Sequence, residues 1–135
     1  KQDWIHTHRE KALAAAEQKA ANRLTEAERK AAVKRAAQML AEKTAHFAKE
    51  MGVTYGRITI REQKTRWGSC SSAGNLNYNW KLVLMPERVM DYVVIHELAH
   101  RKEMNHSARF YAVVAQQMPD YKVWQSWLKE HGREY

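Results

Sequence analysis

His96, Glu97 and His100 have the spacing of a motif that can bind a metal ion. If this segment is helical, residues four apart lie about 40° apart around the axis, so both imidazoles face one point. Glu97 is offset from that point, so its carboxylate can hold water on the metal and accept a proton from it. The pattern predicts a metal-dependent hydrolase in which metal-bound water attacks the substrate and Glu97 is the general base. Zn²⁺ is the expected ion, with another divalent transition metal as the alternative.

A catalytic zinc site needs a third protein ligand, and His106 is the leading candidate. On an unbroken helix His106 would lie about 240° from His100, so the chain must turn between them. Asn105 tolerates the left-handed conformation and Ser107 is a good N-cap, so together they could make that turn. Two other side chains remain alternative third ligands: Asp120 and His131.

The elements before the motif are predicted to be helical. Residues 3–51 are mostly good helix formers and favour two helices, one ending near Arg23. Thr25 and Glu28 form a capping-box pattern that begins the second helix, and Gly52 is placed to end it. The expected packing side of this second helix is a thin stripe strengthened by three larger apolar residues. The stripe runs through Ala27, Lys30/Ala31, Lys34, Ala37/Gln38 and Ala41, and the larger residues are Val33, Leu40 and Phe47.

The middle of the chain is predicted to form a small sheet. Segment 53–61 alternates polar and apolar residues, as a half-buried strand does. Segments 66–70 and 76–80 flank turn residues and indicate a hairpin, whose second strand could continue to Met85. Further helices are expected over 87–102, from Ser107 to Gln117, and from Pro119 to Gly132. The order of helices, a small antiparallel sheet and helices predicts an α+β fold.

Three residues of the predicted hairpin are candidates for substrate contact. Core packing is the ordinary role of Trp67, but segment 66–70 could also be a sheet edge that takes an extended peptide as an added strand. Arg66 or Tyr78 could stabilise the oxyanion that forms during hydrolysis.

Several motifs taken together resemble one known family. They are Arg-Trp-Gly-Ser-Cys-Ser at 66–71, Gly-Asn-Leu at 74–76, Asn-Trp at 79–80, Pro86, Tyr-Val-Val-Ile-His-Glu-Leu-Ala-His at 92–100 and Asn-His-Ser at 105–107. This combination looks like the YgjP-like family of zincin-type metallopeptidases and covers most of residues 25–130. The resemblance implies a minimal zincin-like core, in which a small sheet packs on the active-site helix. It also implies that His96, His100 and His106 bind the metal, that Glu97 is the general base, and that the substrate is a peptide or protein.

The same resemblance suggests how the chain is divided. Residues 25–135 are expected to form the zincin-like metallopeptidase domain. Residues 1–24 are expected to be an N-terminal helix that ends a truncated upstream segment, since family members usually have more sequence there. The lone Cys70 cannot form an internal disulfide, which favours a reducing compartment such as the cytoplasm, and no apolar run is long enough to span a membrane.

The charge of the chain leaves two other functions open. The formal net charge is +8, yet residues 1–50 carry 11 basic and 7 acidic side chains and residues 51–135 carry 12 and 8, so the excess is evenly spread. Weak nucleic-acid or nucleotide binding is therefore an alternative expectation. A metal-dependent phosphoanhydride hydrolase could use four basic side chains near the hairpin: Arg57, Arg61, Lys64 and Arg66. A nucleic-acid-binding module with a structural metal is less favoured, because a structural site does not need Glu97.

Overall fold

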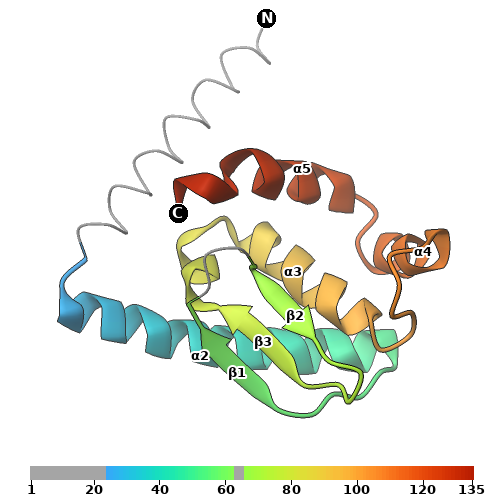
Figure 1. Cartoon of the computed structure of the whole chain (residues 1–135), viewed down its shortest axis with the longest axis horizontal. Coiled ribbons are helices and arrows are strands. Elements are labelled where there is room, and N and C mark those ends of the chain that lie inside the picture. Colours follow the sequence, from blue (N-terminus) through green and yellow to red (C-terminus); the bar gives the residue numbers. More distant parts are fainter. Residues whose placement is uncertain (1–23, 63–65) are drawn as a thin grey trace, which may run out of the picture.

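The computed structural model describes residues 24–62 and 66–135 of the 135-residue chain. The helix predicted before Arg23, and Lys64, lie outside the described residues. Within them the elements follow the order α2, β1, β2, β3, η1, α3, α4, α5 and η2, which confirms the predicted α+β class (Figure 1).

Helix α2 spans Glu26–Met51 and begins and ends where its sequence predicts. The Thr25 side chain accepts a hydrogen bond from the Glu28 N–H at 3.1 Å, and the Glu28 carboxylate accepts one from the Thr25 N–H. Gly52 ends the helix in the left-handed conformation, with φ of 69°. The buried face shares only Leu40 with the predicted stripe and consists mainly of small residues four apart: Ala32, Ala36, Leu40, Thr44, Ala48 and Met51.

The sheet contains strands β1 (Ile58–Arg61), β2 (Gly68–Cys70) and β3 (Leu76–Asn79), with β3 in the centre. The hairpin pair β2 and β3 is antiparallel, as predicted, but β1 pairs with β3 in parallel. The prediction of an all-antiparallel sheet is therefore wrong for β1. β1 and β2 lie on opposite sides of β3 and run in opposite directions, so only β2 is antiparallel to β3. The alternation in the sequence indicates that β1 is a strand but not which direction it takes beside its partner.

The predicted third strand also ends earlier than expected. Trp80–Leu84 forms a 3-10 helix, η1, instead of continuing the strand to Met85. The Asn79 side chain accepts a hydrogen bond from the Lys81 N–H at 3.0 Å, which caps η1 and turns the chain out of the sheet.

One face of the sheet is covered by α2 and by α3 (Glu87–Ala99), which also pack against each other (Figure 1). Ile58, Leu76 and Tyr78 belong to this face, and Leu76 and Tyr78 are each only 1% exposed. The other face is polar: Asn77 accepts a hydrogen bond from Arg61 Nε at 2.8 Å and donates one to Ser69 Oγ at 3.1 Å. Alternation along the strands therefore separates an apolar face from a polar one.

Helices α4 (Ala108–Gln117) and α5 (Tyr121–His131) pack on α3, and a short 3-10 helix, η2 (Gly132–Glu134), follows them. As predicted, Ser107 is the N-cap of α4. None of the helices in residues 24–62 and 66–135 is long and apolar enough to cross a membrane.

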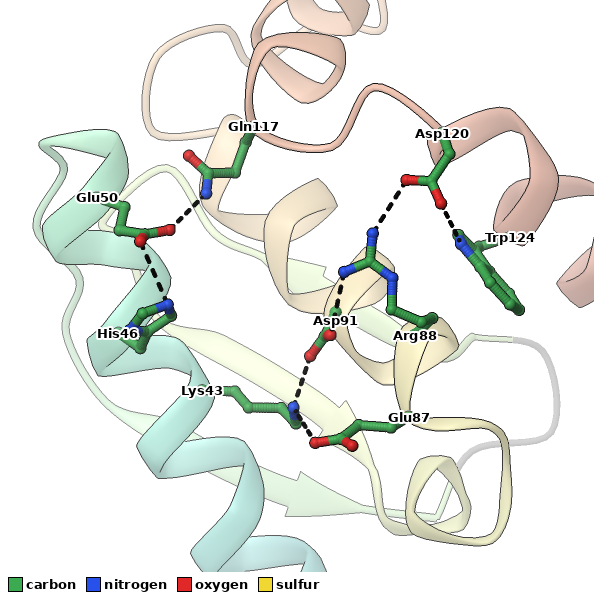
Figure 2. Close-up of polar contacts among 9 residues, drawn as sticks. All are labelled: Lys43, His46, Glu50, Glu87, Arg88, Asp91, Gln117, Asp120 and Trp124. Carbon is green, nitrogen blue, oxygen red and sulfur yellow. Dashed lines mark hydrogen bonds and ion pairs between the residues drawn. The ribbon is translucent and has the colours of Figure 1, made fainter.

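A chain of ion pairs joins α2, α3 and the start of α5 (Figure 2). Lys43 of α2 lies 2.6 Å from Asp91 and 2.8 Å from Glu87, both on α3. Arg88 continues the chain to Asp120, at 3.0 Å, just before α5. Burial opposes the charge on Lys43, but hydrogen bonds to the two carboxylates outweigh it and raise the pKa of Lys43. The network ties α2, α3 and the start of α5 into one unit.

Candidate active site

Three histidines meet at the C-terminal end of α3. His96 and His100 lie one turn apart on that helix, and His106 comes from the loop before α4. One ring nitrogen from each of them lies within 4.8 Å of the other two. In the described part of the chain no other group of three potential ligands is this close. Three imidazole nitrogens at this spacing suit a divalent transition metal.

His106 reaches the group because α3 stops. His100 is the C-cap of the helix, and the next residues form a tight turn in which Glu103 N–H bonds to the Ala99 carbonyl at 3.0 Å. The turn does not use a left-handed Asn105, since no described residue other than glycine has a positive φ. Instead the Asn105 carbonyl accepts a hydrogen bond from Ser107 N–H at 2.8 Å, directly before α4 begins.

His100 is held in the orientation that a metal ligand needs. Its Nδ1 lies 3.2 Å from the Glu103 carbonyl oxygen. A carbonyl can only accept, so Nδ1 carries the proton and Nε2 keeps its lone pair. Burial lowers the pKa of His100, and the neighbouring His96 and His106 lower it further, which together outweigh the opposite effects of Glu97 and of the Glu103 carbonyl. The lowered pKa favours the neutral imidazole, the form that binds metal.

The phenyl ring of Phe110 packs beneath all three imidazoles. Its ring centre lies 4.9 Å from that of His96, 4.5 Å from that of His100 and 4.9 Å from that of His106. Phe110 is 0% exposed, so it forms a fixed floor for the histidines. Sequence reasoning missed Phe110, because its contact with the rings depends on how α4 packs against α3.

Glu97 lies beside the histidines but outside their group. It is 5% exposed, and its Oε2 lies 3.1 Å from His96 Nδ1. The carboxylate faces a cavity of about 370 Å³ that is shared by the three histidines and the residues of β2. We name it the metal cavity, after the ion that the histidines could hold. An acidic side chain in this position can accept a proton from a group bound between the histidines.

Two features hold β2 against α3. Gly68 lies so close that a Cβ built on it would be 3.1 Å from Glu97 Cγ and from Val93 Cγ1. Arg101, the residue after His100, donates to the Thr54 carbonyl at 2.8 Å and to the Ser72 carbonyl at 3.2 Å. The guanidinium thus joins the end of α3 to the hairpin turn and fixes the distance between the helix and the strand.

The other candidates from the sequence lie in different places. Arg66 lines the metal cavity, and Trp67 lines a second cavity beside it. Tyr78 lines neither cavity: it is 1% exposed, and its hydroxyl lies 3.0 Å from Thr44 Oγ1 of α2. Burial raises the pKa of Tyr78, which keeps its hydroxyl neutral.

The two alternative third ligands lie outside the group of three histidines. Asp120 bonds to Arg88 at 3.0 Å and to Trp124 Nε1 at 3.1 Å. His131 is 3% exposed, and its Nδ1 lies 3.5 Å from the Glu134 carboxylate. Cys70 does line the metal cavity, but burial and the nearby Glu97 raise its pKa, so it is a neutral thiol.

Comparison with known proteins agrees with this geometry. A model of the YgjP-like family, described as a metallopeptidase domain, matches residues 1–131. The structure is similar to the metallopeptidase zymogen of Pyrococcus abyssi abylysin, with 24% identity and a TM-score of 0.62 over 70% of this chain and 96% of that chain. It is also similar to the zymogen of Methanocaldococcus jannaschii jannalysin, with 19% identity and a TM-score of 0.52 over 62% and 90%. No curated protein sequence matches the chain significantly.

Proposed function

This chain belongs to the YgjP-like metallopeptidase family, and we propose that it is a zinc-dependent peptidase with Glu97 as its general base. Membership of the family makes it a metal-dependent hydrolase that acts on peptides or proteins. The observation that carries the finer proposal is the meeting of three histidines and a buried glutamate in one cavity beside an edge strand.

His96, His100 and His106 would hold the metal. Catalytic zinc sites have three protein ligands and keep one position open, and three histidine imidazoles meet that requirement. The bond between His100 Nδ1 and the Glu103 carbonyl is the kind of outer contact that orients a ligating histidine. When bound, the ion would lower the pKa of a water molecule and polarise the substrate carbonyl.

Glu97 would move the proton. Its carboxylate accepts a proton from the attacking water and then delivers it to the leaving amine. Gly68 lies against its side chain, since a Cβ built there would be 3.1 Å from Glu97 Cγ and 3.2 Å from its Oε2, and this restricts the positions that the carboxylate can take. This confinement keeps Glu97 next to the reacting water rather than in bulk solvent.

The substrate would bind along β2. This strand lies at the edge of the sheet, paired with β3 on its inner side, and its residues line the metal cavity. An extended peptide added to the outer side would bond to the backbone of β2 and pass beside the histidines. Arg66 lines the same cavity and would stabilise the oxyanion, whereas Tyr78 is turned towards α2.

The decisive experiment is the change Glu97→Gln in metal-loaded protein. The amide keeps the shape of the side chain, so zinc content should equal that of the wild type. Hydrolysis of unfolded protein substrates should fall by about 10²–10⁴, because the proton acceptor is lost. Zinc is measured by mass spectrometry and turnover by peptide release, with nucleoside triphosphates assayed side by side.

Glu42→Gln is the matched control, since Glu42 is exposed on α2 and far from the motif in sequence. It should leave both metal content and turnover unchanged. A Glu97→Gln protein that holds a full complement of zinc and turns over at the wild-type rate would refute the role of Glu97.

A further inference from the structure

A second cavity opens beside the metal cavity. It has a volume of about 170 Å³ and lies between the start of β2, the middle of α3 and the end of α5. His96, Glu97 and Gly68 border both cavities, so the second one begins where the reacting atoms would be. Its remaining walls are apolar or aromatic: Trp67, Tyr92, Val93 and Leu128.

The walls of this second cavity offer few polar partners. Tyr92 is only 5% exposed, and its hydroxyl interacts with the Gln125 side chain. The Trp67 indole packs against the backbone of Gly132, where an added Cβ would lie 3.1 Å from Nε1. Apart from His96 and Glu97 at the border, no charged side chain lines the cavity in the described part of the chain.

The size and chemistry of the cavity select a ligand class. A volume of about 170 Å³ is several times the share of one water molecule, about 30 Å³. Water in such a place lacks hydrogen-bond partners, so an apolar group that displaces it gains binding free energy. An acidic group would meet the Glu97 carboxylate at the border and be repelled.

We propose that this cavity binds the side chain of the substrate residue next to the scissile bond. The enzyme then selects peptides with a large aliphatic or aromatic residue at that position. A peptide lying along β2 places one side chain beside Gly68, where the two cavities join, and that side chain can enter the second cavity. This inference rests on the proposed peptidase function and adds the class of substrate.

The test begins with the wild-type, zinc-loaded protein. An unfolded protein is digested and the cleaved bonds are identified by mass spectrometry. Matched peptides are then made that differ only at the flanking residue, with Phe, Leu, Ser or Glu. We expect kcat/KM to be at least about tenfold higher for Phe or Leu than for Ser or Glu.

Leu128→Arg tests the wall directly. Leu128 is partly exposed on α5, and a guanidinium there should reduce the preference for Phe over Glu by at least about tenfold. Val123→Arg is the matched control: it adds the same charge to the same helix at a residue that is 58% exposed and does not line the cavity. It should leave the preference unchanged. Leu128→Ala adds no charge but enlarges the cavity, so it should improve cleavage of a matched Trp peptide relative to the Leu peptide. This variant is the test of the wall if Leu128→Arg fails to fold.

A binding measurement separates this inference from the proposed function. The zinc-loaded Glu97→Gln protein is titrated with the same peptides by calorimetry, and the Phe and Leu peptides should bind at least about tenfold more tightly than the Ser peptide. Cleavage with no preference at either flanking position, or a preference that both Leu128 variants leave intact, would overturn the pocket and leave the peptidase standing. Selective binding without any hydrolysis by the wild type would overturn the peptidase and support the pocket.

Discussion

At the residue scale, the arrangement of the three histidines depends on neighbours that touch the rings rather than the metal. Phe110 packs under all of them, and the Glu103 carbonyl orients His100. The spacing of His96 and His100 could be interpreted from the sequence because it is a local property of one helix. The position of Phe110 could not, because it depends on how α4 packs against α3.

Phe110→Leu should weaken metal binding while leaving the ligands in place. Leucine fills much of the volume but lacks the aromatic contacts of Phe110, which is edge-on to His96 and His106 and tilted to His100. The imidazoles therefore gain freedom that metal binding must remove. Outer contacts of this kind are worth about 10–100-fold in metal affinity, and we expect a loss in that range. Competition with a chromophoric chelator measures it without any substrate.

Phe47→Leu is the control for a general loss of aromatic packing. Phe47 lies on α2, partly buried against the core, with its ring 5.0 Å from that of His46. This change should lower the free energy of unfolding but leave zinc affinity unchanged. Equal zinc affinity in Phe110→Leu and wild-type protein would show that Phe110 is only core filling.

At the element scale, the ends of a helix were easier to predict than its buried face. The bounds of α2 follow from Thr25, Glu28 and Gly52, whose capping chemistry acts within a few residues. Its buried face was misassigned because alanine occurs all around the helix and gives little periodicity. The parallel pairing of β1 was missed for a related reason: the alternation of Ile58 and Ile60 indicates a strand but not its partner.

The ion pair between α2 and α3 should contribute measurably to stability. Asp91 is 7% exposed, and Lys43→Met would remove its closest cationic partner, leaving only Arg88 at 3.5 Å. We expect the free energy of unfolding to fall by about 1–3 kcal/mol, because a buried carboxylate loses a charged hydrogen bond. The pKa of Lys43 is raised in the folded protein, so this contribution is fully present at pH 7 and is lost only as the pH rises through that raised value. Urea unfolding measures the change.

An exposed ion pair between α2 and the residue after β1 provides the comparison. Arg29 lies 2.8 Å from Glu62, and their side chains are 46% and 44% exposed. Arg29→Met should cost less than about 1 kcal/mol, since water screens both charges. If the two variants lost the same stability, the Lys43 pair would have no special role in joining α2 to α3.

At the scale of the whole molecule, the sheet separates two kinds of surface. Its apolar face meets α2 and α3 and borders the metal cavity, while Arg61, Asn77 and Ser69 form the polar face. That residues 25–135 form the metallopeptidase domain stays a proposal, and the family model also matches the segment before them, over residues 1–131. Alternation in the sequence predicted the two faces, but only the strand order places the basic residues relative to the metal cavity.

That placement bears on the alternative functions. Arg57 and Arg61 belong to the β1 edge of the sheet, on the far side of β3 from β2, and neither lines the metal cavity. Arg61 is also bonded to Asn77 on the polar face. Of the four basic residues that could have served a polyanion, Arg66 lines the cavity and Lys64 lies outside the described residues. Arg57 and Arg61 therefore have no direct route to a phosphate bound at the histidines.

The double change of Arg57 and Arg61 to Gln decides between peptide and polyanion substrates. A nucleotide or nucleic acid held by both arginines would lose two charge-assisted hydrogen bonds of about 1.5–3 kcal/mol each, so KM would rise at least about tenfold and depend less on salt. A peptide that pairs with β2 makes no use of the β1 edge, so KM should hardly change. We expect the second result, measured as KM for one cleaved peptide at low and high ionic strength. A steep rise in KM for a nucleoside triphosphate, together with no peptide cleavage by the wild type, would instead show that the metal centre acts on phosphoanhydrides.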